Sequence, residues 1–297
     1  MKIAALDIGG TSIKAAEYNN GVLSEVKEFE THAERGGAHV IEKALEITGS
    51  FRGIDCIGIS TAGQVDSQKG VIRYANENIP GYTGMKVKEI FEKEFKVPAA
   101  VENDVNAAAL GEAWFGAGRE EKDFLCLTYG TGVGGAVVID REIYRGSSFS
   151  AGEFGAMIVR AGERRPGEDI FSGCYERYAS ATALVRRAAE LDPALDSGRK
   201  IFARLEEEKV KSVVDAWILE VVYGLSTLIH IFNPSCVILG GGVMSQKYIL
   251  DKIREILYNH IMKSYHNVVV KQAALENKAG ILGAVKIAEK VWEKNHE

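Results

Sequence analysis

Two glycine- and threonine-rich turns have the composition of a phosphate-binding backbone. Gly9–Thr11 follows the strand-like run Lys2–Asp7, and Gly130–Gly132 follows Phe124–Tyr129. Glycine lacks a Cβ, so backbone N–H groups in such turns can approach a phosphate and form an anion-binding concavity. The threonine hydroxyls would add donors, and two such turns could hold a triphosphate. The alternative is a pair of tight β-turns that need glycine only for positive φ.

The context of these turns excludes two common nucleotide motifs. The sequence contains no G-x-x-x-x-G-K-[ST], and no G-x-G-x-x-G opens a helix. A P-loop and a dinucleotide fold are therefore disfavoured. Each turn instead joins two strand-like runs at the head of a β-β-β series, which indicates two related halves.

A strand-to-helix junction carries the candidate catalytic group. The run Ala99–Glu102 is strand-like, and a helical pattern begins at Asp104. Residues at such a junction project from the carboxyl edge of a sheet. Asn103 offers a donor and an acceptor to a hydroxyl-rich ligand, and Asp104 could accept a hydroxyl proton as a general base. The alternative is helix capping, for which Asn and Asp are preferred.

Three glycine-containing segments in the second half are further candidates. Glu153 and Glu176 each lie close to glycines, and carboxylates can accept hydrogen bonds from the vicinal hydroxyls of a sugar. A salt-bridged or solvated glutamate is the alternative for each. Gly240–Gly242 follows an apolar run and could form a flat wall for a nucleotide base, or an ordinary loop.

The composition is that of a soluble globular protein. The 297 residues are 46% hydrophobic and 26% charged, with a net charge of −5. This excludes disorder and argues against sequence-independent binding of nucleic acid, which needs a basic face. The four cysteines form no C-x-x-C, so a disulfide framework or zinc ribbon is not expected. No signal peptide is expected at the first residues, and Val213–Phe232 contains charged residues that favour a core helix over a membrane span. A cytoplasmic location is the expectation.

An α/β fold must position these residues, with mixed sheets covered by helices. Strands are predicted at Lys2–Asp7, Ile13–Tyr18, Val22–Phe29, Ile54–Ser60, Ala99–Glu102, Phe124–Tyr129, Gly134–Ile139, Ile143–Tyr144, Cys236–Leu239 and Val268–Lys271. Helices are predicted at Ala38–Ile47, Val87–Phe95, Asp104–Trp114, Ala181–Ala189, Arg199–Lys209, Ser212–Phe232, Gln246–Met262 and Ala279–Lys294. The segment Phe115–Lys122 has the composition of a connection between the two halves.

Five segments in order resemble the ROK family of sugar kinases, within the actin-like ATPase superfamily. They are Asp7–Lys14, Ile59–Asp66, Glu102–Ala107, Gly130–Gly135 and Gly240–Val243. The resemblance implies a two-domain actin-like ATPase (ribonuclease H-like) fold that closes on a sugar. Residues 1–115 would form the sugar-side domain, with the helix at about 280–297 packing back on it. Residues 116–297 would form the domain for the nucleotide and for dimerisation.

The resemblance also implies residue roles. Asp104 would take the proton from the sugar 6-hydroxyl. Sugar contacts would come from Gly63, Asn78, Asn103, Asp104, Glu153 and Glu176. Contacts to ATP would come from Asp7, Gly9, Gly10, Thr11, Lys14, Thr131, Gly132, Gly240, Gly241 and Gly242. Mg²⁺ would lie between the phosphate turns, with no protein ligand assigned to it.

One departure from the family pattern concerns structural zinc. Many members have a histidine where this chain has Ala156, and three cysteines where it has Gly167, Asp169 and Cys174. One thiol cannot replace four zinc ligands, so no zinc is expected. Ala156 leaves room near the anomeric carbon, and this pattern resembles the zinc-free branch that includes β-glucoside kinases and some N-acetylmannosamine kinases.

The expected activity is phosphoryl transfer from ATP to a hexose or hexose derivative. β-Glucosides, N-acetylmannosamine, glucose and fructose remain open as substrates. The alternative is a sugar-binding regulator without kinase activity, which in this family carries a DNA-binding domain before the first motif. Here that motif starts at Asp7, which leaves no room for one within the sequence. The family resemblance also favours a homodimer.

Overall fold

The computed structural model describes residues 1–296, which form two compact units. Unit 1 contains residues 1–120, 141–151 and 274–297, and unit 2 contains residues 121–140 and 152–273. Residues 141–151, which the division at 115/116 assigns to the second domain, therefore belong to unit 1. Residues 274–297 also belong to unit 1 and include the helix that was expected to pack back on the first domain.

Unit 1 is a mixed sheet with strand order β3-β2-β1-β5-β8, and β4 also pairs with β2. Its strands are β1 (Lys2–Ile8), β2 (Ser12–Asn19), β3 (Val22–Leu23), β4 (Lys27–Glu30), β5 (Cys56–Thr61) and β8 (Ala99–Asn103). β1 runs antiparallel to β2 and parallel to β5, and β5 runs parallel to β8. The carboxyl ends of β1, β5 and β8 therefore meet at one edge of the sheet, where Asp7, Thr61 and Asn103 lie.

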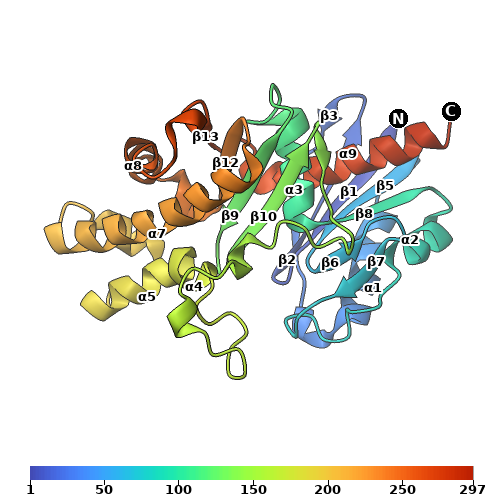
Figure 1. Ribbon diagram of the computed structural model, residues 1–297. Coiled ribbons are helices and arrows are strands. Elements are labelled where there is room, and N and C mark those ends of the chain that lie inside the picture. Colours follow the sequence, from blue (N-terminus) through green and yellow to red (C-terminus); the bar gives the residue numbers. More distant parts are fainter. Residues whose placement is uncertain (297) are drawn as a thin grey trace. The chain divides into compact units, whose positions relative to one another are not determined.

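Helices cover both faces of this sheet because the side chains of β1 alternate between two cores. Ala4, Leu6 and Ile8 belong to one hydrophobic cluster, and Ile3 and Ala5 belong to the other. The first cluster contains residues of α1 (Gly37–Gly49) and α2 (Val87–Phe95). The second contains residues of α9 (Ala279–Lys294), which packs along β1 and β5 and also against α3 (Asp104–Phe115) (Figure 1).

The α9 helix approaches its neighbours closely through glycines. A Cβ on Gly58 of β5 would overlap the Ala284 carbonyl of α9. A Cβ on Gly283 of α9 would overlap the Ala107 carbonyl of α3. Because a side chain at either position would push the elements apart, these glycines set the distance from α9 to the sheet and to the helix that begins at Asp104.

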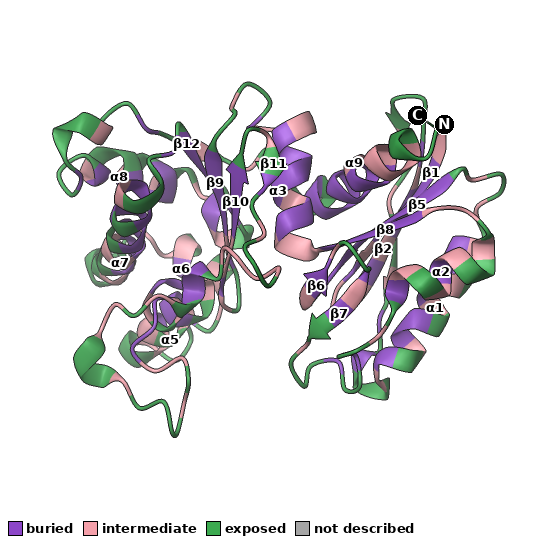
Figure 2. Cartoon of the chain, turned by 45° about the vertical axis from the view of Figure 1, so that its right-hand side comes forward, coloured by how far each residue is buried: buried purple, intermediate pink, exposed green. Residues whose placement is uncertain are grey.

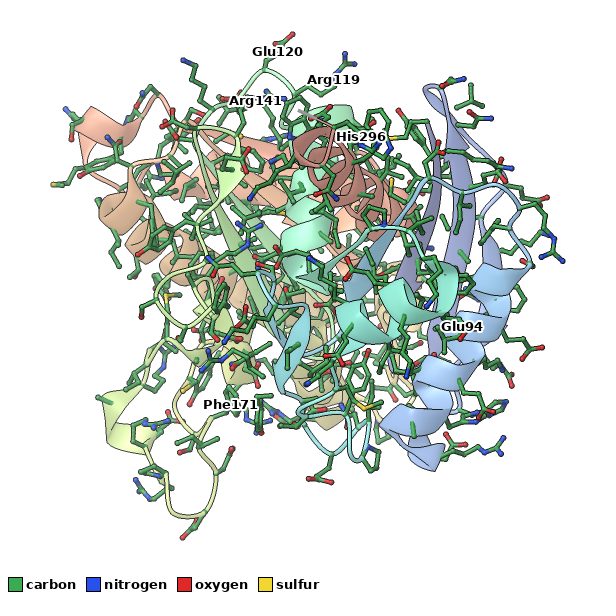
Figure 3. The ribbon with its side chains drawn as sticks, turned by 90° about the vertical axis from the view of Figure 1, so that its right-hand side faces the viewer. Glu94, Arg119, Glu120, Arg141, Phe171 and His296 are labelled. Carbon is green, nitrogen blue, oxygen red and sulfur yellow. The ribbon has the colours of Figure 1, made fainter. Side chains whose placement is uncertain are left out.

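Shorter elements complete unit 1. They are the hairpin β6 (Gln64–Asp66) and β7 (Val71–Tyr74), the strand β11 (Glu142–Ile143), and the 3₁₀ turns η1 (Ala33–Arg35) and η6 (Glu276–Lys278). Arg141, at the start of the segment 141–151, donates hydrogen bonds to the carbonyl oxygens of Arg119 and Ala113. Figure 3 labels Arg141 and Arg119. This segment is thus attached to the end of α3.

Unit 2 repeats the same strand pattern, with order β10-β9-β12-β13. β9 (Phe124–Tyr129) runs antiparallel to β10 (Val133–Ile139) and parallel to β12 (Cys236–Gly240), which runs parallel to β13 (Val269–Gln272). The helices are α4 (Glu176–Ala179), α5 (Ala181–Leu191), α6 (Gly198–Ala203), α7 (Glu208–Phe232) and α8 (Lys247–Leu257). The 3₁₀ turns are η2 (Phe154–Ala156), η3 (Ala161–Glu163), η4 (Gly242–Ser245) and η5 (Lys263–Tyr265). The shared pattern of antiparallel pair plus parallel strands agrees with the two related halves seen in the sequence.

A long helix forms the centre of the unit 2 core. α7 is long and apolar enough, by length and composition, to cross a membrane, but 56% of its most apolar window is buried inside the protein. Trp217, Val221 and Leu225 on α7 belong to the main hydrophobic cluster. The purple stretches of α7 and of the strands β9, β10 and β12 in Figure 2 show this buried face.

Three predicted elements differ from the structure. Arg199–Lys209 is not one helix, because α6 ends at Ala203 and α7 begins at Glu208. The acidic run Glu206–Glu208 explains the break, because acidic side chains are favourable at the N-terminus of a helix and unfavourable at its C-terminus. These residues therefore favour the start of α7 over a continuation of α6. Val22–Phe29 is split into β3 and β4, and the helix predicted over Gln246–Met262 ends at Leu257.

Candidate functional site

The first glycine turn, between β1 and β2, is open on its outer side. Gly9 N–H donates to the Ser12 carbonyl oxygen at 2.9 Å, and Gly10 and Thr11 are exposed. Neither Gly9 nor Gly10 has a positive φ, and a Cβ on Gly10 would meet nothing within 4 Å. The backbone conformation therefore does not require glycine at position 10, which leaves close approach by a ligand as a physical reason for it.

Asp7 and Lys14 lie opposite each other at the base of this turn. They are paired across the antiparallel strands β1 and β2. Ser60 Oγ of β5 donates to Asp7 Oδ1 at 2.6 Å. The Asp7 carboxylate also stands at the start of α9, where a Cβ on Gly280 would come within 2.8–2.9 Å of it. Burial raises the pKa of Asp7, and the Ser60 hydrogen bond and the Lys14 charge oppose the rise.

The second glycine turn, between β9 and β10, has the same construction. Gly130 N–H donates to the Gly132 carbonyl oxygen at 3.0 Å, and Gly130 and Thr131 are exposed. A Cβ on Gly130 would meet nothing within 4 Å, and neither glycine has a positive φ. The alternative of glycines that serve only a left-handed turn does not apply to either site.

Asn103 and Asp104 combine capping with orientation of the carboxylate. Asn103 is the N-cap of α3, and its Oδ1 accepts from the N–H groups of Val105 and Asn106 at 3.0 and 3.1 Å. Its Nδ2 donates to the Gly63 carbonyl oxygen at 2.9 Å and to Asp104 Oδ1 at 2.8 Å. Capping is therefore done by Asn103, and Asp104 is the first residue of the helix.

The Asp104 carboxylate is fixed through one oxygen. Oδ1 accepts from Asn103 Nδ2 and from Val105 N–H at 2.9 Å. Burial raises the pKa of Asp104 to about 6, the Asp7 carboxylate adds to the rise, and the hydrogen bonds oppose it. A carboxylate with such a pKa is ionised near neutral pH and is a stronger base than an ordinary aspartate, as general base catalysis requires.

The two other sugar candidates in unit 1 differ in their placement. Gly63 has φ 95° and contributes the carbonyl that holds Asn103, so it supports the junction through its backbone. Asn78 lies in an exposed turn, where its N–H donates to Asn76 Oδ1 at 3.2 Å. The structure does not bring Asn78 into hydrogen-bond contact with Asn103 or Asp104.

Glu153 and Glu176 are brought together in unit 2. Burial raises the pKa of Glu176, and the Glu153 charge contributes to the rise, while Arg177 and the Val133 N–H oppose it. A Cβ on Gly132 would come within 2.6 Å of Glu176 Oε2, so this carboxylate lies directly against the second glycine turn. Glu153 stands at the position before η2 and is exposed.

A buried tyrosine pair links that turn to Glu176. Tyr129, which precedes Gly130, and Tyr175, which precedes Glu176, share a hydrogen bond of 2.9 Å between their hydroxyls. Tyr175 also donates to the Val221 carbonyl of α7 at 2.9 Å. Gly224 makes space for the Tyr175 ring, because a Cβ there would overlap it. Sequence reasoning missed this pair, since nothing local marks two tyrosines 46 residues apart as partners.

A cavity of about 430 Å³ in unit 2 adjoins Gly242. Its size is in the usual range of about 300–1,000 Å³ for small-molecule sites. Of the glycine trio, Gly242 lines it, whereas Gly241 has φ 100° and a Cβ there would overlap the Tyr129 carbonyl. The remaining lining residues come from the end of β9 and from α5, α6 and η4: Tyr129, Gly130, Ala181, Leu184, Val185, Gly198, Arg199, Phe202, Val243 and Gln246.

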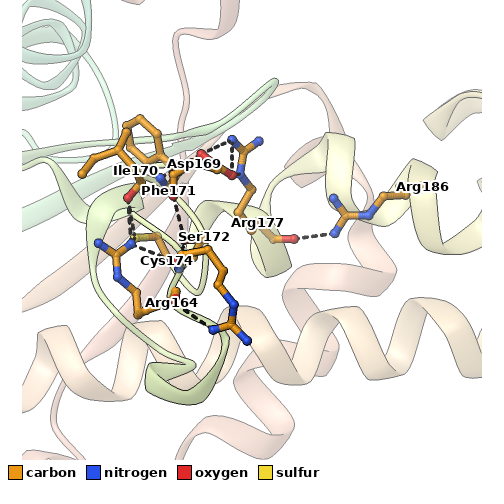
Figure 4. Close-up of polar contacts among 9 residues, drawn as sticks. Arg164, Asp169, Ile170, Phe171, Ser172, Cys174, Arg177 and Arg186 are labelled. Carbon is orange, nitrogen blue, oxygen red and sulfur yellow. Dashed lines mark hydrogen bonds and ion pairs between the residues drawn. The ribbon is translucent and has the colours of Figure 1, made fainter. Parts of the chain in front are cut away.

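The excursion 157–175, which leads to Glu176, is cross-linked by arginines. Arg164 Nη1 donates to the carbonyl oxygens of Ile170 and Ser172 at 2.7 and 2.6 Å and lies 3.2 Å from Cys174 Sγ (Figure 4). Arg177 forms a two-pronged ion pair with Asp169. A guanidinium thus holds the part of the loop where the family pattern places metal ligands. The expected lack of zinc stays a prediction.

Metal binding by protein side chains alone has no basis in the described part of the chain. Among residues 1–296, no three His, Cys, Asp or Glu side chains gather as a metal-binding group. Mg²⁺ commonly takes one or two carboxylates and completes its coordination with water and substrate phosphates. A single carboxylate such as Asp7, at the base of the first glycine turn, is compatible with that kind of site.

The comparisons with known proteins agree with this arrangement. The family model described as "ROK family" matches residues 3–291. The chain belongs to the ROK family. It is 34% identical over 296 residues to the beta-glucoside kinase of Listeria monocytogenes, covering 96% of each chain.

Solved ROK structures share the fold over the whole chain. The ROK hexokinase from Thermus thermophilus is 31% identical with a TM-score of 0.84, covering 99% of this chain and 100% of the other. A ROK family glucokinase from Streptomyces griseus, in complex with glucose and AMPPNP, is 29% identical with a TM-score of 0.82, covering 98% and 100%. The actin-like fold expected from the sequence is confirmed by these neighbours.

Proposed function

We propose that the protein is an ATP-dependent carbohydrate kinase that transfers the γ-phosphoryl group to the 6-hydroxyl of a hexose or hexose derivative. The observation that supports this most directly is the β8–α3 junction. There Asn103 holds one oxygen of Asp104, and the raised pKa makes the carboxylate a competent base near neutral pH. The kinase activity of similar ROK proteins is consistent with this assignment.

Asp104 is proposed to accept the proton of the attacking hydroxyl. Among the described residues, both hydrogen bonds to its side chain use Oδ1, which leaves Oδ2 for the substrate. General base catalysis typically contributes about 10²–10⁴-fold, and holding the reacting groups about 3 Å apart supplies further rate enhancement. Asn103, fixed by Gly63 and by the helix N–H groups, keeps the base in place while the hydroxyl is bound.

The two glycine turns and the unit 2 cavity are proposed to bind ATP. The open faces of Gly10, Gly130 and Gly242 would accept backbone contacts from phosphates and ribose. The cavity beside Gly242, lined by Leu184, Val185 and Phe202, has the apolar character that a purine needs. Bound Mg·ATP would supply the phosphoryl group and neutralise its charge, as in other phosphoryl transfers.

Sugar recognition is proposed for Asn103 and Asn78 in unit 1 and for Glu153 and Glu176 in unit 2. The half-buried Glu176 carboxylate would accept hydrogen bonds from vicinal hydroxyls. Ala156, which is exposed two residues after Phe154, adds no bulk beside these groups. We therefore expect tolerance of a substituted hexose, such as a β-glucoside or N-acetylmannosamine, in addition to glucose. A cytoplasmic homodimer is part of the same proposal.

A sugar panel with Mg·ATP tests the proposed function. The coupled assay measures ADP release with β-glucosides, N-acetylmannosamine, glucose and fructose, and calorimetry measures sugar binding in parallel. We expect turnover with at least one of these sugars, with the phosphate on O6 by NMR. Tight binding of a sugar without turnover would instead identify a sugar-binding regulator.

The variant Asp104→Asn tests the catalytic assignment. Asparagine keeps the acceptor for Asn103 and Val105 but cannot take a proton, so kcat should fall by at least about 10²-fold, the usual size of general base effects. Sugar affinity by calorimetry should stay within a few-fold of wild type. Near-normal turnover of a correctly folded variant would remove Asp104 from the role of base.

A further inference from the structure

An ion pair between a buried carboxylate and a partly exposed arginine lies directly behind the proposed catalytic junction. Glu102, the residue before Asn103, is 1% exposed, and its Oε2 accepts from Arg145 Nε at 2.8 Å and from Arg145 Nη2 at 2.7 Å. The two residues are 43 positions apart in the sequence, and both belong to unit 1. Two guanidinium nitrogens thus converge on one carboxylate oxygen, and charge-assisted hydrogen bonds of this kind are stronger than neutral ones.

The other oxygen of Glu102 accepts hydrogen bonds from the β8–α3 junction. Oε1 accepts from the backbone N–H of Asn103 at 3.0 Å and from Asn106 Nδ2 at 3.2 Å. One carboxylate therefore ties together the last residue of β8 and the first turn of α3, on both sides of Asp104. Asn106 is 4% exposed, and its Oδ1 has no hydrogen-bond partner among residues 1–296, so the Glu102 contact is what orients this buried amide.

Arg145 is itself held by the segment that carries it. Its carbonyl oxygen accepts from Ala151 N–H at 3.1 Å and closes a loop over residues 145–151. Its Nη1 donates to the Ile143 carbonyl oxygen at 3.2 Å. Gly146 has φ 67°, the left-handed conformation that lets the chain turn immediately after the arginine. The guanidinium is thus presented to Glu102 by a closed loop and not by a free side chain on the surface.

The charge balance makes the arginine necessary. A carboxylate removed from water without a partner is costly, so loss of the arginine leaves the buried Glu102 charge uncompensated. Asp7 and Asp104 add two more carboxylates at the same edge of the sheet, and Ser60 stands between Asp7 and Glu102 in the strand register. Without Arg145, the uncompensated charge on Glu102 favours a shift of the junction or entry of water.

We propose that the Arg145–Glu102 pair is a positioning unit that holds the β8–α3 junction in the geometry in which Asp104 acts. This inference rests on the proposed function for its catalytic consequence, whereas its structural part concerns the junction alone. In this proposal Arg145 acts on Asp104 indirectly, through the Glu102 carboxylate and its hydrogen bonds to Asn103 and Asn106.

The kinetic test uses Arg145→Met, with sugar KM and kcat measured separately. A displacement of the base by about 1 Å can cost about 10²-fold in rate, so we expect kcat per folded molecule to fall by that factor with sugar affinity within about threefold of wild type. Arg145→Lys keeps the charge and should recover about tenfold of the loss. The double variant Glu102→Gln/Arg145→Met should be more active than Arg145→Met, because no buried charge is left unpaired.

Arg141→Met is the matched control. Arg141 lies four residues earlier in the same segment and also bonds to the α3 region, but through the Ala113 carbonyl at the other end of the helix. Its loss should lower stability and leave kcat unchanged. Equal losses of kcat in the Arg141 and Arg145 variants would show a general effect on unit 1 and would overturn the proposal.

Hydrogen exchange keeps the test independent of the kinase assay. In Arg145→Met the amides of Asn103–Asn106 should exchange faster, whereas in Arg141→Met they should keep wild-type protection. If the wild type turns over no sugar, the proposed function fails and this exchange comparison alone decides on the positioning unit. If Arg145→Met does not fold, Arg145→Lys is judged by the same criteria. Unchanged kcat and unchanged exchange at residues 103–106 would overturn the proposal.

Discussion

At the scale of single residues, Asn103 shows why capping and chemistry could not be separated in the sequence. The motif Glu102–Asp104 is local in the sequence. The structure shows that Asn103 caps the helix, whereas the role of Asp104 as a base stays a prediction. The Asn103 amide uses its oxygen for the helix N–H groups and its nitrogen for Gly63 and Asp104. An aspartate at position 103 could cap the helix but could not donate to Asp104.

The raised pKa of Asp104 gives a prediction for the pH dependence of activity. Because the base must be ionised, kcat/KM should fall as the pH drops through about 6, the value to which burial and Asp7 raise the pKa. The measurement is a pH profile of sugar phosphorylation between pH 5 and 9, with the coupling enzymes in excess. An acidic limb that lies near pH 4 instead would show an ordinary carboxylate at this position.

The raised pKa of Asp104 also predicts an effect on stability. Ionisation of this carboxyl, which favours activity, should lower the free energy of unfolding. An acid with a folded-state pKa above its unfolded value binds its proton more tightly when folded, so this group destabilises the fold as the pH rises from about 4 through about 6. Asp104→Asn should therefore raise Tm above pH 7, and the gain should shrink towards pH 5. Equal Tm values at pH 8 would contradict the burial effect.

Contacts between residues far apart in the chain were the ones that could not be predicted from the sequence. Ser60 on Asp7, Arg145 on Glu102, and Tyr175 on Tyr129 are all contacts between different elements. Each partner is an unremarkable residue in its own segment. The positions of the glycine turns and of the β8–α3 junction were predictable because glycine, threonine, asparagine and aspartate mark turns and helix starts through adjacent backbone groups.

At the scale of elements, the close packing of α9 yields a stability prediction. Gly283→Ala places a methyl group against the Ala107 carbonyl, so α9 and α3 must separate. Overpacking of this kind costs typically about 1–3 kcal/mol, and α3 begins at Asp104, so kcat should fall with the free energy of unfolding. Denaturant titration and the kinase assay measure the two effects.

Gly49→Ala is the control for that prediction. Gly49 is the last residue of α1, has no positive φ, and its added Cβ would meet only Phe95 at 4.0 Å. Alanine there should be neutral or stabilising by about 0.4–1 kcal/mol, because it restricts the unfolded chain. A Gly283→Ala variant as stable as Gly49→Ala would mean that α9 can move away without cost.

The excursion 157–175, which Arg164 cross-links through hydrogen bonds, yields a second prediction at this scale. Arg164→Met removes the bonds to the Ile170 and Ser172 carbonyls, so the segment before Glu176 should loosen. We expect faster proteolysis there and a several-fold higher sugar KM with little change in kcat. Arg165→Met is the control, because Arg165 Nη1 bonds, within the described part of the chain, to the nearby carbonyls of Gly162 and Arg164 alone.

Zinc chelation tests whether the excursion 157–175 is held by arginine hydrogen bonds or by a metal ion. Incubation of the wild type with a zinc chelator should leave its Tm and its sugar KM unchanged, and metal analysis should find no stoichiometric zinc. A fall in Tm on chelation would show that the loop needs a metal despite its single cysteine, Cys174.

Most elements were predictable from hydrophobic periodicity, and the errors have a local cause. The hairpin turn at Asn19–Gly21 forms as its residues suggest, with positive φ at Asn20 and Gly21. The helix break within Arg199–Lys209 was missed because Ile201, Phe202 and Leu205 keep a helical spacing across it. The competing preference of Glu206–Glu208 for a new helix start decides the structure.

At the scale of the whole molecule, the order of the chain through the two units was the least predictable feature. The chain passes from one unit to the other at 120/121, 140/141, 151/152 and 273/274. Only the first passage has a compositional signal, in the glycines and charges after Phe115. The segment 141–151 has none, because its assignment depends on the contacts of Arg141 and Arg145 with α3 and Glu102.

The quaternary state is a prediction for the whole protein. A homodimer should scatter light with twice the mass of a single chain at micromolar concentration, with and without sugar. The family resemblance and the frequency of twofold oligomers support this expectation. A mass that corresponds to one chain over the same concentration range would contradict it.

The late position of α9 in the chain has a consequence for biosynthesis. All of unit 2 has been translated by residue 273, whereas the β1–β5 face of unit 1 gains its covering helix only with residues 279–294. During synthesis, unit 2 should therefore be able to fold before unit 1. This is the reverse of the usual order, in which domains made earlier fold earlier on the ribosome. A premature stop codon shortly after position 273 would release a chain that lacks α9, so that β1 and β5 remain uncovered on one face of the sheet.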